Sequence, residues 1–600
     1  MTATTLLADM SQCQPADCLE RGYRHGTWRL IDYETTEFAG TMVYSGPGMQ
    51  SPTLTLPLQR EGLHAIHLGV HYPEQGANAH LCVRLTGDDT LAPVWAERPY
   101  PKDVSGMPEE LKASIAGKQF SHWQVSEVFW KVADLTGQEL VLSRSDSAAH
   151  AGLYSNLVHV RLVPLSAAAA ADFREEEPRP DTRRIIAMND GGIFTSLHGR
   201  DDILAQFEPY RDSDVEIMMW APFKGENVTY RSRIARPAPT EANPFDRFAH
   251  NDRTDETLKR FEFQGLDFLP EVVTAAHDVG VRIFSSLRLQ GPKPVPVDLE
   301  PGTLFDDHPE FRCRDRQGRI INHLSMAFPE VRERWRALLL ETLESGFDGV
   351  HVLFCRSHPF VLYEQPVIDR FLDEYGEDPR DSGEDDPRFW RVLSTFVTEF
   401  LRELRRSVDE MGAAQGRRLD IACSITSTQQ SRLMAPGDDP SARPEVEGGS
   451  GRFGSTDLLA SNLMWGIDVE TMVHERLADY LLPHPAFAVN AGTWLPDLMR
   501  LVTGTGVKVY PDLYPRRLPP AAALYSGETL YSLGCDGIAM WDTYNRTPRL
   551  SEWAMLSRLG HREEIPRWRA QGRGDGYFRV LDFLRLGDQS GDPRYFQTNG

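Results

Sequence analysis

Two patterns of apolar and polar residues divide the chain. From about Thr27 to Leu165, short alternating or apolar runs are separated by Gly, Pro and Asp turns, a pattern typical of antiparallel strands. The clearest runs read LHAIHLGVHY, AHLCVRLTG, SEVFWKVADL, QELVLSRS and NLVHVRLVPL. We therefore expect an N-terminal all-β sandwich domain over residues 1–165.

The composition changes sharply after this region. Residues 166–183, SAAAAADFREEEPRPDTR, pass from alanine to acid and proline, which packs poorly against either neighbour. We interpret this segment as an interdomain linker. Residues 563–600 are expected to form a C-terminal extension that packs on the second domain.

Beyond the linker, short apolar strands alternate with helical segments, as a parallel α/β domain requires. Eight strands are predicted, at 184–190, 215–223, 281–289, 349–356, 419–426, 478–485, 507–514 and 537–543. Eight such units favour a (β/α)8 TIM barrel over residues 184–562. The turn after the first strand, Asn189 to Gly192, lacks the GxGxxG spacing of a dinucleotide-binding fold.

Two strands of the predicted barrel share one entry sequence. Gly346-Phe347-Asp348-Gly349 precedes the fourth strand and Gly534-Cys535-Asp536-Gly537 precedes the eighth. Glycine suits a left-handed helix C-cap, and aspartate suits a tight turn. We therefore interpret Asp348 and Asp536 as structural residues.

The long polar segments all follow the carboxyl ends of predicted strands, where barrel active sites lie. Glycoside cleavage needs two carboxyl groups, one as acid and one as nucleophile or base. Asp512 and Asp542 end adjacent strands, Asp190 ends the first strand, and Glu364 lies farther along the loop after the fourth. Each of these four candidate catalytic residues has a structural alternative, as a helix cap, a turn residue or a solvated loop carboxylate.

Sugar sites also need flat apolar faces and hydrogen-bond donors. Trp220, Tyr514 and Trp541 are candidates for the faces, although each could also be a packing residue. The donor candidates are Lys224, Arg288 and Arg356, with His358 and His484 also near strand ends. Two arginines and a lysine would suit an anionic sugar such as a uronate, or they would pair with strand-end aspartates.

The composition of the chain limits the classes of partner and cofactor that we expect it to bind. The formal net charge of −23 argues against nucleic acid binding, and no apolar run approaches the length of a membrane span. The seven scattered cysteines and the missing signal-peptide pattern favour a cytoplasmic protein. No HExxH, paired CxxC, GxSxG or GxxxxGK[ST] motif is present, so we expect no metal and no cofactor. A homo-oligomer remains an open alternative.

Three stretches carry a family resemblance. HPEFRCRDRQGRIINHLSMAFPEVRERW (308–335), GFDGVHVLFCRSHP (346–359) and DVETMVHERLADYLLPHP (468–485) resemble bacterial barrels described as family-10-type glycosylhydrolases. The resemblance implies a (β/α)8 fold and a carbohydrate substrate over about 185–560. Related barrels place acidic residues at the end of the fourth strand, whereas this chain has Cys355-Arg356 there.

The leading hypothesis is a glycoside hydrolase that cleaves an oligo- or polysaccharide with a carboxylate pair. One alternative is a sugar-acid lyase or isomerase on the same barrel, which would move a proton. Another is a carbohydrate-binding protein without catalysis, since the fourth-strand carboxylates are missing.

Overall fold

The computed structural model describes most of the 600 residues of the chain. The described ranges are 3–71, 80–89, 91–95, 123–144, 154–189, 197, 199–236, 254–289, 302–354, 358–383, 385–427, 457–514, 518, 520–541 and 555–591.

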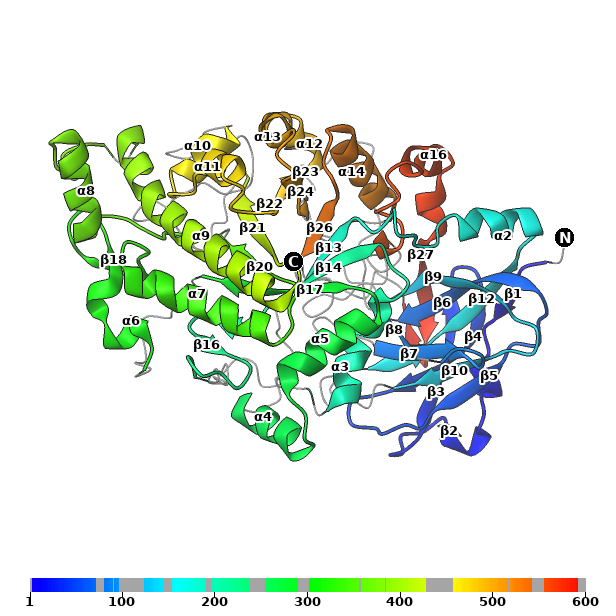
Figure 1. Ribbon diagram of the computed structural model, residues 1–600. Helices are drawn as coiled ribbons and strands as arrows, with labels where there is room; N and C mark the ends of the chain where they lie inside the picture. The colour runs from blue at the N-terminus through cyan, green and yellow to red at the C-terminus, as the bar shows by residue number, and fades with distance from the viewer. Residues whose placement is uncertain are drawn as a thin grey trace.

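The N-terminal region forms two β-sheets whose pairs are antiparallel, apart from the parallel pair of β2 and β3 (Figure 1). The larger sheet has the order β1 (Thr5–Leu7), β12 (His159–Pro164), β6 (Leu63–His71), β9 (Gln124–Asp134), β27 (Phe578–Leu586), β3 (Trp28–Thr35), β4 (Ala39–Ser45) and β11 (Ser155–Leu157), with β2 (Leu19–Glu20) and β28 (Gln589–Ser590) beside it. The smaller has the order β5 (Leu54–Pro57), β10 (Glu139–Ser143), β7 (His80–Leu85) and β8 (Ala92–Trp95).

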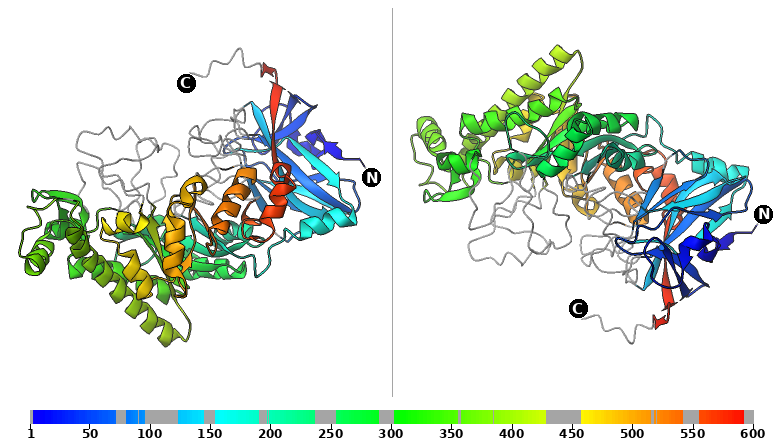
Figure 2. Two further views of the ribbon diagram at one scale, coloured as in Figure 1. Left: turned by 90° about the horizontal axis from the view of Figure 1, so that it is seen from above. Right: turned by 90° about the horizontal axis from the view of Figure 1, so that it is seen from below.

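The C-terminal segment corrects one expectation. Instead of only packing on the second domain, it supplies β27, which pairs with β9 on one side and β3 on the other. Figure 2 shows this red strand among the blue strands of the N-terminal region. Leu581 and Phe583 are buried while Asp582 and Leu584 are exposed. This period of two matches a strand with one covered face, so the N-terminal sheet combines strands from the first and last described parts of the chain.

The segment 166–183 also differs from the linker expected there. It forms helix α2 (Ala167–Arg174), which begins where Ser166 Oγ accepts a hydrogen bond from Ala169 N at 3.1 Å. Glu176 follows the helix and is 4% exposed. Its carboxylate accepts hydrogen bonds from Arg558 Nε at 2.9 Å and Tyr577 Oη at 2.7 Å. The segment is therefore fastened to the C-terminal part of the chain by a buried charge.

Eight parallel strands form the sheet of the second region. Its order is β24 (Lys508–Val509), β22 (Tyr480–His484), β21 (Asp420–Thr426), β20 (Gly349–Leu353), β17 (Arg282–Arg288), β14 (Val215–Trp220), β13 (Ile185–Asn189) and β26 (Ile538–Trp541). All eight predicted strands are found, each within its predicted range. The first and last strands in this order are connected by hydrogen bonds from Asp536 N to Val509 O at 3.0 Å and from Ala539 N to Pro511 O at 2.9 Å.

Helices alternate with these strands along the chain (Figure 1). They are α3 (Arg200–Phe207), α4 (Thr254–Phe263), α5 (Phe268–Asp278), α6 (Leu304–Asp307), α7 (Pro329–Glu344), α8 (Gln365–Tyr375), α9 (Pro387–Gln415), α10 (Leu458–Leu463), α11 (Val469–His474), α12 (Ala488–Ala491), α13 (Leu495–Val502), α14 (Pro520–Ser532) and α16 (Ile565–Ala570). Short strand pairs lie in the connections: β15 (Phe223–Lys224) with β16 (Asn227–Val228), β18 (Arg312–Arg314) with β19 (Ile320–Leu324), and β23 (Ala486–Phe487) with β25 (Leu513–Tyr514).

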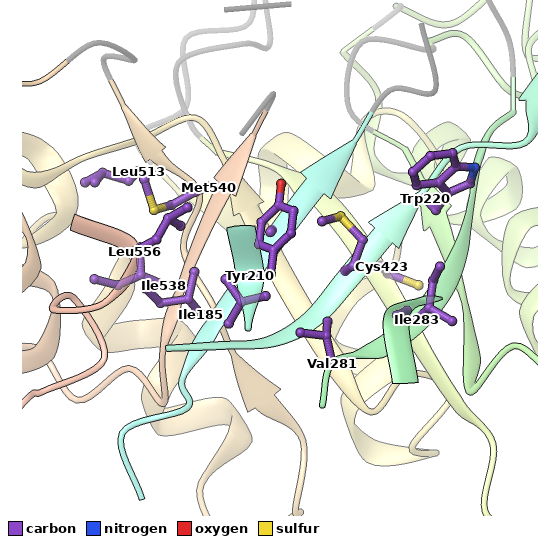
Figure 3. Packing of buried hydrophobic residues seen from close by; sticks show 14 of the residues in the cluster. Ile185, Tyr210, Trp220, Val281, Ile283, Cys423, Leu513, Ile538, Met540 and Leu556 are labelled. Atoms are coloured by element: carbon purple, nitrogen blue, oxygen red, sulfur yellow. The ribbon is translucent and has the colours of Figure 1, made fainter. Parts of the chain in front are cut away.

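Alternation along the strands separates the two faces of the parallel sheet. One face contributes a single buried cluster with side chains from seven of the eight strands and from Tyr510, which directly follows β24: Ile186, Met188, Ile217, Met219, Phe284, Leu353, Ala422, Tyr480, Leu482, Tyr510, Ala539 and Trp541. Side chains from strands at both ends of the order can share one cluster because the sheet curls around it, so we call this the inner face. The alternate side chains, among them Ile185, Ile283, Ile538 and Met540, belong to the large cluster of the outer face (Figure 3).

The repeated strand entry has the predicted structural role. Gly346 and Gly534 have φ of 106° and 98°, in the left-handed region that favours glycine. Asp348 Oδ2 accepts a hydrogen bond from Ile283 N, and Asp536 Oδ2 accepts one from Val509 N, both at 2.8 Å. Each aspartate thus binds the first residues of the neighbouring strand, at the end of the sheet opposite the predicted site.

Candidate active site

Three predicted site residues meet at the carboxyl ends of neighbouring strands on the inner face. His484 ends β22, Trp541 ends β26, and Asp512 lies between them in an isolated parallel bridge with Ala539. Asp512 N donates to Pro483 O at 2.9 Å, which fixes the register of the aspartate beside the end of β22. The curl of the sheet therefore brings together residues from three separate parts of the sequence.

Asp512 and His484 form a buried pair. His484 Nδ1 donates a hydrogen bond to Asp512 Oδ2, and the two residues are 2% and 1% exposed, respectively. The His484 ring also packs on the Trp541 ring, with centroids 4.8 Å apart. Within the described ranges, Asp512 Oδ1 is buried and has no hydrogen-bond partner. A buried carboxylate oxygen without a partner is costly to maintain, so this atom is the one best placed to receive a group from a substrate.

A second cluster adjoins this pair through Thr426, the last residue of β21. Thr426 pairs in register with His484, and its Oγ1 lies 3.3 Å from His358 Nε2. Asn462 fixes the strand end, since Thr426 N donates to its Oδ1 at 2.9 Å and its Nδ2 donates to Thr426 O at 2.7 Å. The His358 ring packs on Trp465 with centroids 4.6 Å apart. The sequence placed His358 near the site, but Trp465 was interpreted as a packing residue and Asn462 was not a candidate, since both follow a long insertion and share no local motif with His358.

The buried histidines of this cluster are uncharged near neutral pH. Burial, together with the nearby His323, lowers the pKa of His358 to about 3. Burial alone lowers the pKa of His323, on β19, to about 4. A neutral imidazole carries one donor and one acceptor nitrogen, so each ring can both give and accept a hydrogen bond.

Glu364 is enclosed by the protein, which corrects its proposed catalytic role. The residue is fully buried, and its carboxylate accepts hydrogen bonds from Arg314 N at 2.7 Å, Ser325 Oγ at 2.8 Å and Leu362 N at 2.9 Å. Burial raises the pKa of this carboxyl group. Arg314 and Ser325 belong to the β18–β19 hairpin and its end, and Leu362 belongs to the loop that carries His358. Glu364 therefore connects the hairpin to this loop.

Trp220 is also misplaced for sugar binding. It belongs to the outer-face cluster, is 2% exposed, and stacks on Phe207 with ring centroids 5.4 Å apart. Figure 3 shows it among the buried hydrophobic side chains of that cluster. The alternation along β14 explains the difference, since Met219 points to the inner face and Trp220 therefore points to the helices.

The remaining predicted residues fall into two groups. Arg288 ends β17 and is half-buried, and it pairs in register with Leu353. Tyr514 lies on β25, half-buried, with its ring 4.8 Å from that of Phe487. Lys224 ends β15, but its side chain lies outside what the structure describes, as do all atoms of Asp190, Arg356 and Asp542.

A groove of about 410 Å³ lies at the other end of the strands, between α9, α11 and the starts of β21 and β22. It is lined by arginines and carboxylates that largely neutralise one another, as when Arg405 and Arg418 reach Asp479 at 2.9 and 2.7 Å. We assign this groove to the ion-pair network that anchors the strand starts.

Among the described residues, no three His, Cys, Asp or Glu side chains are grouped so that they could hold a metal ion. None of the helices described is both long and apolar enough to cross a membrane.

Comparisons with known proteins give no family. No protein-family model matches the chain, and no curated protein matches it. Solved structures similar to it include an α-galactosidase from Thermus thermophilus in complex with p-nitrophenyl α-D-galactopyranoside, at 13% identity over 90% of this chain and 95% of that one, with a TM-score of 0.30. Others are a maltogenic α-amylase from Thermotoga neapolitana (11% identity, 63% and 76%, TM-score 0.32) and an exo-β-N-acetylglucosaminidase from Vibrio harveyi (10%, 72% and 62%, 0.35). At these TM-scores, function has to be argued from the residues of this chain.

Proposed function

We propose that this protein is a glycoside hydrolase and that Asp512 is one of its two catalytic carboxylates. The observation that carries the proposal is the buried Asp512 Oδ1, which has no partner among the described residues, at the carboxyl end of the curled sheet. The sheet is inferred to be a closed (β/α)8 barrel, since hydrogen bonds from Asp536 N and Ala539 N join its two end strands. The two N-terminal sheets are inferred to form a sandwich.

The second carboxylate is proposed from sequence position. Asp542 follows Trp541 directly, and Asp190 follows β13, the strand beside β26. Either would come from a strand end near Asp512 if it faces the inner side. One group would protonate the leaving oxygen, and the other would act as nucleophile or activate water. Trp541 is 3% exposed and packs on His484, so its ring supports the buried pair from the inner-face cluster.

A sugar-acid lyase or isomerase is a second candidate, favoured by one specific observation. A buried histidine hydrogen-bonded to a carboxylate is a common arrangement for proton transfer, because the carboxylate orients the ring and stabilises its charged form. The His484–Asp512 pair has this arrangement. Products separate the two candidates, since a lyase forms an unsaturated product that absorbs in the ultraviolet, whereas hydrolysis forms a reducing end.

The test is a panel of p-nitrophenyl glycosides and plant and bacterial oligosaccharides, incubated in water enriched in ¹⁸O. Hydrolysis is expected to release a reducing sugar that carries one solvent oxygen. Asp512→Asn should lower kcat by about 10²–10⁴-fold, whereas Asp497→Asn, at an exposed position of α13, should leave kcat unchanged. Full activity of the Asp512 variant would exclude the assignment, and binding without turnover across the panel would favour a non-catalytic carbohydrate-binding protein.

A further inference from the structure

A group of polar side chains beside the His484–Asp512 pair has unused hydrogen-bonding capacity. The group consists of His323, His358, Ser427 and Trp465. Ser427 directly follows Thr426 at the end of β21, and its backbone N donates to His484 O at 2.9 Å. The group therefore contacts the candidate active site in two ways: through the backbone of Ser427, which is bonded to His484, and through the side chain of Thr426, which lies beside His358.

Three buried atoms of this group have no hydrogen-bond partner within the described ranges: Ser427 Oγ, Trp465 Nε1 and His323 Nδ1. Ser427 is fully buried and Trp465 is 7% exposed. Buried polar atoms are nearly always paired in folded proteins, so several unpaired atoms in one place need an explanation.

A nearby buried histidine, His351, differs from this group because both of its ring nitrogens are paired. His351 lies on β20, one strand away, and both of its nitrogens are paired, with Ser286 Oγ and Ser424 Oγ, each at 2.8 Å. At His351, the neighbouring strands thus provide a hydrogen-bond partner for each nitrogen of a buried imidazole. Unlike His351, the group around His358 therefore contains buried atoms that the described residues leave unpaired.

The hydrogen-bonding chemistry of the unpaired atoms indicates which ligand groups would bind to them. The indole N–H of Trp465 only donates a hydrogen bond, and a serine hydroxyl both donates and accepts. A neutral imidazole donates from one nitrogen and accepts at the other. No member of the group is charged near neutral pH, because burial keeps the pKa of both imidazoles low. Such a mixture of donors and acceptors matches hydroxyl groups, which also donate and accept, better than it matches a carboxylate or a phosphate.

The rings add the second half of a sugar site. The His358 and Trp465 rings pack at 4.6 Å, and His358 also contacts Phe360 at 5.2 Å. Carbohydrates present apolar C–H faces between their hydroxyls, so a site for them combines ring faces with hydrogen-bonding atoms.

We propose that His323, His358, Ser427 and Trp465 form a binding subsite for the hydroxyl groups of a neutral sugar, next to Asp512. This proposal rests on the proposed function and adds the substrate class: the unit bound here is uncharged, in contrast to the uronate that the arginine candidates suggested. Glu364 positions the subsite, because it holds the hairpin carrying His323 against the loop carrying His358.

The test reads out binding separately from catalysis. The protein, with its 12 tryptophans replaced biosynthetically by 5-fluorotryptophan, is titrated with D-galactose, D-glucose, D-mannose and N-acetyl-D-glucosamine, and with D-glucuronate as the anionic probe. The ¹⁹F resonance of Trp465 is assigned by its loss in Trp465→Phe, with Trp494→Phe as the matched control. We expect at least one neutral sugar to shift this resonance and D-glucuronate to leave it in place.

Variants identify the atoms involved. Ser427→Ala should weaken binding of the neutral sugar by about threefold to tenfold, the effect of one lost hydrogen bond, whereas Ser394→Ala, buried on α9, should not change it. His358→Phe keeps the ring packing and should weaken binding similarly. A Trp465 resonance that no neutral sugar shifts, or that D-glucuronate shifts more strongly, would overturn the subsite.

The outcomes separate this proposal from the previous one. A shift without turnover of any glycoside would support the subsite and contradict the hydrolase assignment. Turnover of a glycoside without a shift by its own monosaccharide would contradict the subsite while leaving the hydrolase assignment in place.

Discussion

His484 donates a hydrogen bond from Nδ1 to Oδ2 of Asp512, and both side chains are almost completely buried at the ends of neighbouring strands. The register places them together, because Asp512 N is bonded to Pro483 O, one residue before His484. Removing either partner therefore leaves the other as a buried polar group without compensation. The two residues are expected to behave as one energetic unit.

A double-mutant cycle tests this unit. His484→Phe keeps the ring packing on Trp541 but removes the donor, and Asp512→Leu removes the acceptor at similar volume. Each single variant should lose about 1–3 kcal/mol of unfolding free energy. The double variant should lose less than the sum, with a coupling of about 0.5–3 kcal/mol. Urea unfolding at neutral pH measures all four proteins, and additive losses would show that the pair is not coupled.

Glu176 is predicted to be a major contributor to stability. Its carboxylate accepts hydrogen bonds from Arg558, Arg573 and Tyr577, and Arg558 is itself only 5% exposed. Glu176→Gln leaves a buried guanidinium without its counter-charge and should lower the unfolding free energy by about 3–5 kcal/mol. The neighbouring Glu175, which pairs with Arg567 on the surface, provides the control. Glu175→Gln should barely move the urea midpoint, and equal effects of the two variants would refute the role of burial.

Local sequence patterns were sufficient to predict the parallel sheet. Each of its strands is a short apolar run between turn signals, and the entry turns at Gly346 and Gly534 depend on a backbone conformation that glycine adopts most readily. These signals act within a few residues, so they can be read without knowing the partner strands. Asp512, His484 and Trp541 followed from the same rule, since all three lie at or near strand ends.

Other features depend on partners far away in the sequence. β27 pairs with β3, which precedes it by more than 500 residues, so no local pattern specifies the pairing. Glu364 was taken as a candidate catalytic residue because its three hydrogen-bond donors, on the hairpin and the loop, could not be read from the sequence around it. The orientation of Trp220 was predictable in principle, but only once the alternation along β14 was fixed by its inner-face neighbours.

The inserted position of β27 gives a further prediction. Phe583 is 1% exposed and packs edge-on against Tyr33 and His71, with centroids at 5.7 and 5.2 Å. Phe583→Ala should cost about 3–5 kcal/mol, because it opens a cavity in the N-terminal sheet. Leu584→Ala, next in sequence and 50% exposed, is the control and should have little effect. If urea unfolding shows equal losses for the two variants, β27 is not packed into this sheet.

His351, on the inner face of the curled sheet, makes stability depend on pH. Burial lowers its pKa to about 3 in the folded protein, whereas an unfolded histidine titrates near its ordinary value of 6.5. Between these two pH values the unfolded state binds one proton more than the folded state, so stability rises with pH across this window and is constant above it. As pH falls below 6.5, His351 alone should reduce the unfolding free energy by about 1.4 kcal/mol per pH unit.

Substitution of His351 isolates this contribution from those of the other buried histidines. His351→Gln can still hydrogen-bond to Ser286 and Ser424 but cannot take up a proton. Urea unfolding of the variant between pH 6 and pH 4.5 should therefore show a shallower fall in stability than the wild type, by about 2 kcal/mol over the whole interval. Above pH 7 the difference between the two proteins should no longer depend on pH. Parallel curves throughout would mean that His351 takes up its proton in the folded state as readily as in the unfolded chain.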